Sequence, residues 1–220
     1  MFSPAGVELQ SPKMKKILLV SGVFAFAFAI LSVSILESSA ITYPSVGPMI
    51  GQNGPKSDAS EINYQFPSAG KVLPDSPFWE LKALRDRIWY LITPSPLKKA
   101  ELALLFSDKR LVSAQTLLAE GKPDIAISTL TKGEKYLEIA VNEEKIARSQ
   151  DYNTSEFLTK LATASLKHRE VIENLLPMVP EQGKPVVIEI ENYSKNTYKD
   201  ARDGLYSKGL PVPIDPFGGD

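Results

Sequence analysis

Leucine recurs every seven residues between Leu97 and Leu118, and this repeat constrains the fold more than any other feature of the sequence. Small residues stand between the leucines, so large and small side chains alternate along one stripe: Leu97, Ala100, Leu104, Ser107, Leu111, Ala114 and Leu118. Such a seam is typical of closely packed antiparallel helices. Charged residues such as Asp108 fall outside the seam. The repeat therefore predicts a long helix that forms one half of a helical hairpin.

Start and stop signals set the limits of this hairpin. Ser95 and Pro96 predict the start of the leucine-rich helix, because serine caps a helix N-terminus and proline fits the first turn. Gly121 followed by Pro123 predicts its end and the start of the next helix, which extends to about residue 150. Glycine costs about 1 kcal/mol relative to alanine inside a helix. Gly133 therefore indicates a close approach between the two helices.

The same signals predict three further helices. One begins at Ser76 and Pro77, with an apolar stripe made of Phe78, Leu81, Leu84 or Arg85, Ile88 and Leu91. Another begins at Asn153 or Thr154, with a stripe made of Leu158, Leu161, Ser165, His168, Ile172 and Leu175. The last, residues 186–206, is polar beyond Ile190, which favours an edge position; residues 186–188 could alternatively form a short strand. The predicted fold is all-α: an antiparallel bundle of four to five helices with a long central hairpin, over residues 75–206.

A basic and then apolar segment precedes the bundle. Residues 1–16 contain three lysines, and residues 17–36 are an uncharged, mostly apolar run. Ser38 and Ala40 provide the small residues that a signal peptidase needs, so residues 17–40 are expected to be a signal peptide cleaved after Ala40. The alternative is a retained anchor, since twenty helical residues span about 30 Å. Translation from Met1 or from Met14 fits either alternative. Both place the chain after Ala40 outside the cytoplasm.

Composition removes several classes of function. The chain has 25 basic and 26 acidic residues, of which three and two lie in residues 1–40. The remaining chain therefore carries 22 basic and 24 acidic residues, a balance that does not favour binding to nucleic acid. The chain has no cysteine, which excludes disulfides, a lipoprotein anchor and thiolate metal sites. Proline and glycine without periodicity predict a disordered linker over residues 41–74 and a flexible tail over residues 207–220.

The region around the first two helices resembles a known family. Its string over residues 73–122 follows the pattern P-x-S-P-x-[YFW]-x-L-K, then K-A-x-L, then R-L-x-x-A-x-x-L, through Pro74, Ser76, Pro77, Leu81, Lys82, Lys99, Ala100, Leu102, Arg110, Leu111, Ala114 and Leu117. This resembles a bacterial extracytoplasmic family known only as a domain of unknown function. Trp79 and Ser113 depart from it, where the family favours tyrosine and glutamate. The resemblance implies an exported helical domain and no catalytic residues.

Few residues offer chemistry. His168 is the only histidine, and we interpret it as a core-edge residue that is hydrogen-bonded to a neighbour, rather than a ligand or a base. A di-iron site would need glutamate at position 165, which is Ser165, and a second histidine. Two pairs of glutamates could serve acid–base chemistry, namely Glu134 with Glu138 and Glu143 with Glu144. Nearby lysines instead favour a solvated helix face on which these glutamates form ion pairs. The sequence predicts no catalytic residue, cofactor or metal site.

One candidate surface remains. Large aromatic and basic residues gather on the first two helices of the bundle, and we predict a partner-binding surface from Trp79, Trp89, Tyr90, Arg85 and Arg110. The alternatives are packing at a helix junction for the aromatic residues and interhelical ion pairs for the basic ones, which also include Lys82, Arg87 and Lys109 with Asp86.

Three functional hypotheses follow from these observations. The first is an exported or membrane-tethered helical domain that is not an enzyme and binds or scaffolds an unknown protein partner. The second is the extracytoplasmic sensing subunit of a transmembrane regulatory complex, which requires that residues 17–36 persist in the membrane. The third is an envelope hydrolase, which the few candidate groups disfavour.

Overall fold

The computed structural model describes Ser21 and residues 62–218. The predicted signal peptide or anchor, residues 17–40, lies outside the described residues apart from Ser21. In the described part, the chain forms five α-helices and one 3-10 turn, and no strand. The helices are α2 (Trp79–Ile92), α3 (Pro96–Ala119), α4 (Pro123–Ser149), α5 (Ser155–Leu175) and α6 (Lys184–Ser207). None of the described helices is long and apolar enough to span a membrane.

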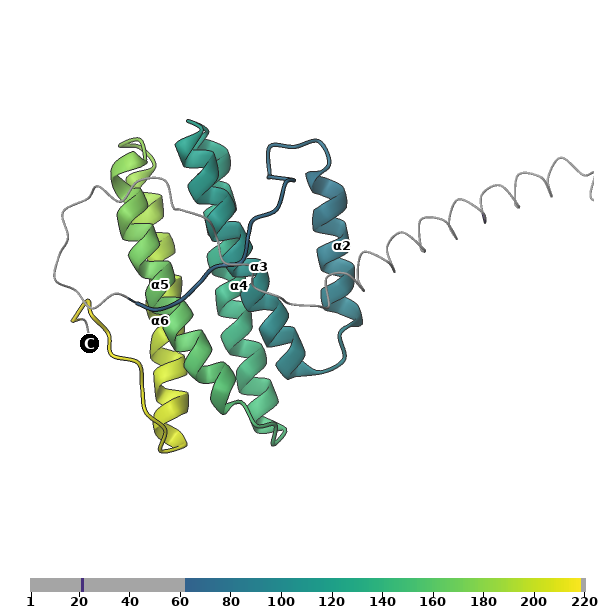
Figure 1. Ribbon diagram of the computed structural model, residues 1–220, viewed down its shortest axis with the longest axis vertical. Helices are drawn as coiled ribbons and strands as arrows, with labels where there is room; N and C mark the ends of the chain where they lie inside the picture. The colour runs from purple at the N-terminus through teal and green to yellow at the C-terminus, as the bar shows by residue number, and fades with distance from the viewer. Residues whose placement is uncertain (1–20, 22–61, 219–220) are drawn as a thin grey trace, which may run out of the picture. The chain divides into compact units, whose positions relative to one another are not determined.

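Two antiparallel hairpins form the bundle. α3 packs along α4, and α5 packs along α6, while α4 contacts α6 and α3 contacts α5 (Figure 1). α2 lies at the outer edge, beside α3. This arrangement confirms the predicted all-α bundle with a long central hairpin. It corrects the prediction for the last helix, because α6 packs against two helices rather than at an edge and residues 186–188 are helical.

Local signals explain the limits of the central hairpin. Ser95 accepts a hydrogen bond from the Lys98 backbone N–H, and Pro96 occupies the first turn of α3. Gly121 has a φ of +73°, a left-handed conformation that suits glycine, and the next N–H bonds back to the Leu117 carbonyl at 2.9 Å. This closed turn folds the chain back into α4 over three residues. The predicted start and end of the leucine-rich helix are therefore confirmed.

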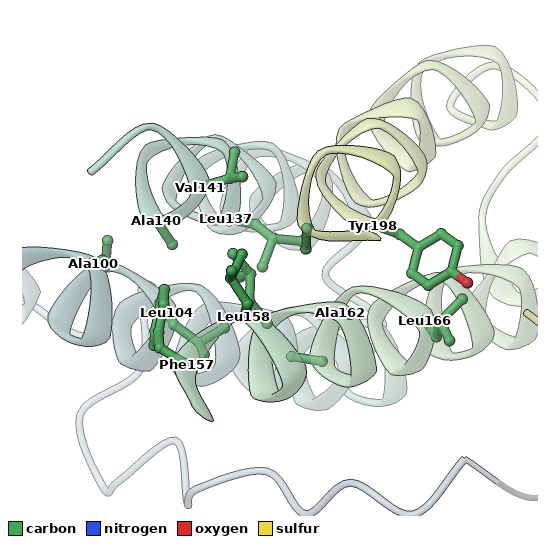
Figure 2. Close-up of a cluster of buried hydrophobic side chains, with 14 of the residues drawn as sticks. Ala100, Leu104, Leu137, Ala140, Val141, Phe157, Leu158, Ala162, Leu166 and Tyr198 are labelled. Carbon is green, nitrogen blue, oxygen red and sulfur yellow. The ribbon is translucent and has the colours of Figure 1, made fainter. Parts of the chain in front are cut away.

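The hairpin and the second helix pair enclose an apolar core. Leu104 of α3, Leu137 of α4 and Leu158 of α5 are at most 1% exposed and meet between the helices (Figure 2). Small residues fill the spaces between them, as Ala100, Ala140 and Ala162 show. The alternation of leucine with small residues thus allows the helix axes to approach. A second apolar cluster around Leu111, Leu130 and Ile172 continues the core.

Gly133 lies at the closest approach of α3 and α4. A β-carbon built at Gly133 would lie 3.1 Å from the Arg110 Cβ and 3.4 Å from the Ser107 carbonyl oxygen. This confirms that glycine here marks close packing of the two helices. We predict that Gly133→Leu lowers the free energy of unfolding by about 1–3 kcal/mol because the larger side chain overpacks the interface.

The matched control for Gly133→Leu is Lys132→Leu, at an exposed position one residue away on α4. Exposed substitutions of this kind change stability by less than about 0.5 kcal/mol. Urea denaturation of both variants measures the difference. Equal stabilities of the two variants would contradict the close approach.

Two segments outside the helices also pack on the bundle. Residues 62–69 fall in the predicted disordered linker, yet Phe66 and Ala69 are buried, and Figure 1 shows this segment, in dark blue, crossing α5 and α3. The described residues of the predicted flexible tail also make contacts, since the Tyr198 hydroxyl donates to the Pro213 carbonyl at 2.8 Å and the Arg169 guanidinium lies 4.2 Å from the Phe217 ring centroid. These residues of the predicted linker and tail therefore lie packed against the bundle.

Candidate functional site

Three titratable side chains meet inside the bundle, one from each of three helices. His168 of α5 lies between Glu134 of α4, 2.6 Å from its Nδ1, and Asp108 of α3, 3.0 Å from its Nε2. All three residues are fully buried. We call this the buried charge network. It lies in the bundle interior, where an ionised group is stable only when it has a partner of opposite charge.

The geometry of the network favours a charged histidine. A neutral imidazole carries one N–H, whereas both ring nitrogens of His168 face carboxylate oxygens. Burial opposes the charge, but the negative charges of Glu134 and Asp108 outweigh it and raise the pKa of His168 to about 9. His168 is therefore an imidazolium at neutral pH and bridges two carboxylates.

An extended segment covers the network from outside. The Tyr64 hydroxyl donates to Asp108 Oδ2 at 2.8 Å, and the Phe66 ring packs edge-on against the His168 ring, with centroids 5.4 Å apart. We call residues 62–69 the strap. The strap supplies a hydrogen bond to a buried carboxylate and an apolar cover for the imidazole. It thereby connects the chain before α2 to the centre of the bundle.

The predicted roles of the network residues change accordingly. Asp108 was expected outside the seam and Glu134 on a solvated face, but both are buried, and His168 is at the centre rather than the edge of the core. Each carboxylate follows a small seam residue, Ser107 or Gly133, and His168 occupies the stripe of its own helix. The signal that could have revealed the network is a titratable residue in, or next to, the apolar stripe of each of three helices.

The network lies closed inside the bundle. The two carboxylates lie at opposite nitrogens of the imidazole, so His168 stands between them. In the part of the chain that the structure describes, no cluster of three or more histidine and acidic side chains is arranged to hold a metal ion. A substrate would have to displace Phe66 and the strap to reach His168. The arrangement instead fixes how three helices and the strap fit together.

A second buried carboxylate secures the turn between α4 and α5. Glu144 is fully buried and accepts a hydrogen bond from the Thr154 hydroxyl at 2.7 Å, while Arg148 lies 3.3 Å away. Thr154 therefore bonds to α4 and makes no side-chain capping bond to its own helix, for which the sequence offered Asn153 or Thr154 as the cap. Asn153 accepts from the Ser155 backbone N–H at 3.2 Å and takes the capping role.

The residues of the predicted partner surface lie where α2 meets α3 and α4. Trp89 packs edge-on against Phe106, with centroids 6.2 Å apart, and the Tyr90 hydroxyl donates to Glu143 at 2.6 Å. Burial and this bond raise the pKa of Tyr90. These two aromatic residues attach α2 to the bundle through their inward side.

The basic residues of this junction are also partly buried. Arg110 lies over the rings of Tyr136 at 4.3 Å and Trp79 at 5.9 Å, and Arg85 pairs with Asp86 at 2.8 Å. Lys82 donates to a carbonyl at the end of the strap and to one just after it, those of Ala69 and Val72, at 3.0 and 2.9 Å. Burial lowers the pKa of Lys82 to about 8, against the attraction of Asp86.

The apolar stripe predicted for the first helix points away from the bundle. α2 begins at Trp79 rather than at Ser76, and Asp86 is its only fully buried residue. Leu81, Leu84 and Leu91 are 66, 54 and 75% exposed. Trp79, Trp89 and Tyr90 occupy the inward side of α2 instead. The leucines therefore form an exposed row on the outer side of an ordered helix.

The fold and the site together define a helical bundle that is held by an internal charge network. The family model described as "Domain of unknown function (DUF5667)" matches residues 71–182, just over half of the chain. The chain belongs to this family. The match runs from the end of the strap through α5 and leaves α6 outside. Neither a curated protein nor a solved structure matches the chain.

Proposed function

We propose that this chain is an exported or membrane-tethered domain that binds a protein partner and performs no catalysis. The exposed apolar row of α2 carries the proposal. Large apolar side chains on a soluble surface are costly unless a partner covers them, and contiguous patches mark interaction sites. The titratable groups of the bundle interior are engaged in packing, as the buried charge network shows. The surface of α2 thus remains as the part of the domain that is suited to recognition.

The test places a photo-cross-linking residue at Leu84 of the full chain in intact cells, and at Tyr206 as the matched control. Both positions are exposed helical sites, 54 and 65%, but Tyr206 lies on α6. We expect a protein adduct from position 84, its loss when Leu91→Asp is added, and none from position 206. Lipid adducts at position 84, or equal adducts from both positions, would refute the proposal.

A second candidate is the sensing subunit of a transmembrane complex. The strap favours it, because the chain before α2 contacts the bundle at Asp108 and His168 rather than at the edge. A change in the bundle would then reach the preceding segment directly. This candidate requires that residues 17–36 persist, so a mature N-terminus at Ile41, found by N-terminal sequencing, would eliminate it.

A further inference from the structure

α2 has two faces that differ in character. The face toward the bundle carries Trp79, Asp86 and Trp89, which pack beside α3. The opposite face carries Leu81, Leu84, Ile88 and Leu91; the leucines are exposed and Ile88 is half-buried. A helix with two faces of this kind is suited to lie between two bodies. One of these bodies is its own bundle.

The spacing on the outer face identifies the second body as a helix. Leu81, Leu84, Ile88 and Leu91 are three, four and three residues apart, which is the a–d–a–d spacing of a coiled coil. The 14 residues of α2 hold two heptads of this pattern. Leu81 and Ile88 occupy the a positions, and Leu84 and Leu91 occupy the d positions. Isoleucine at a with leucine at d favours a parallel coiled coil of two strands.

We propose that the α2 helix of a second copy of this chain docks on this face, parallel and in register, to form a two-stranded coiled coil. The inference rests on the proposed function, in which the α2 face binds a protein, and it assigns that protein. Each a and d residue meets its own counterpart across a twofold axis. The leucines that one copy exposes are then buried by the same leucines of the other.

The charges beside the seam support the parallel direction. Glu80 precedes the first a residue, at a g position, and Arg85 follows the first d residue, at an e position. In a parallel pair, g of one copy lies beside the next e of the other, so Glu80 meets the second copy's Arg85. Arg85 also pairs with Asp86 in its own chain, and a guanidinium has five N–H donors for both.

The antiparallel direction brings like charges together. It places e beside e and g beside g, so Arg85 would meet Arg85, and Arg87 would meet Arg87, of the second copy. Like charges across a seam disfavour pairing. A membrane surface is also less suited to α2, because interfacial helices keep a basic polar face toward the headgroups, whereas the face opposite the leucines packs beside α3.

The test uses the absence of cysteine from the chain. In a parallel pair, a d position lies close to its own counterpart, within the Cα separation of about 4–7 Å that a disulfide requires. We expect the full chain with Leu84→Cys or Leu91→Cys to form disulfide-linked dimers under mild oxidation. Tyr206→Cys, an equally exposed thiol on α6, should remain monomeric. Adding Leu81→Asp to Leu84→Cys should abolish the dimer.

Thermal unfolding by circular dichroism shows that each variant is folded, which is expected because Leu81, Leu84, Leu91 and Tyr206 are exposed and Ile88 is only half-buried. A disulfide that forms only when the Leu84→Cys chain is mixed with the Ile88→Cys chain, and not with either variant by itself, would overturn the parallel register. Folded variants without dimers at any seam position would overturn the inference. In that case the photo-adduct from position 84 still decides whether the face binds a different protein, so the two proposals fail separately.

Discussion

Replacing His168 with leucine is expected to lower the free energy of unfolding by about 3–5 kcal/mol, the range found when one partner of a buried ion pair is removed. The imidazolium separates Glu134 from Asp108 in the bundle interior, with one carboxylate at each ring nitrogen. Without it, two buried carboxylates lose their partner at once. They must then take up protons or draw water into the core, and both processes favour the unfolded chain.

The control for this variant is Asn174→Leu, at an exposed position on the same helix. Its stability should stay within about 0.5 kcal/mol of the parent. Urea denaturation, with circular dichroism as the readout, measures both variants. A triple variant that also carries Asp108→Asn and Glu134→Gln should recover part of the loss, because its buried groups are uncharged. A loss below about 1 kcal/mol for His168→Leu would contradict a charged bridge.

The titration of His168 alone is expected to lower the stability of the parent chain by about 3 kcal/mol as the pH rises from 6.5 to 9. The pKa of this histidine is raised from 6.5 to about 9 in the folded bundle. The folded state therefore keeps a proton that the unfolded chain releases above pH 6.5. The stabilisation is complete below pH 6.5 and disappears as the pH passes 9. Glu134, Asp108 and the Tyr64 hydroxyl bonded to Asp108 are the polar groups of the network.

Lys82 acts in the opposite direction at higher pH. Its pKa is lowered to about 8, so above pH 8 the unfolded chain binds more protons at this site and stability gains from a further rise. The histidine therefore dominates the window from pH 6.5 to 8, with an expected net fall of about 1–2 kcal/mol, because Lys82 releases its proton only as the pH approaches 8. Urea titrations at several pH values measure it. His168→Leu should remove the slope in this window, and an unchanged slope in that variant would assign the effect to another group.

Features that depend on a few neighbouring residues could be predicted from the sequence. Helix ends leave backbone N–H and C=O groups without partners. Local residues solve this within one turn, as Ser95 with Pro96 and Gly121 with Pro123 do, so their effect is independent of the rest of the fold. The seven-residue leucine repeat similarly identifies a stripe that must be buried. These signals gave the all-α class and the central hairpin. Gly133 could be interpreted because glycine inside a helix has few roles other than close packing.

Features that depend on distant segments could not be predicted. Asp108 and Glu134 look like surface residues on their own helices, and their burial follows only when His168 of a third helix supplies the opposite charge. The strap has no periodicity because Tyr64 and Phe66 are held one by one rather than by a repeating pattern. For α2, the pattern showed correctly that an apolar stripe exists. The pattern does not show which side of α2 packs against the bundle, and in the structure this is the opposite side, which carries Trp89.

The strap also determines where the domain would feel a mechanical load. Tension in the chain that precedes Ile62 reaches the folded domain at Tyr64 and Phe66, on the flank of α3 and α5, before it can pull on α2. The Tyr64–Asp108 hydrogen bond and the Phe66 ring would yield first, while the helix hairpins are still intact. Peeling of the strap would expose His168 to water and weaken its bridge. A pull on one end of the molecule would thus be converted into hydration of the buried charge network at its centre.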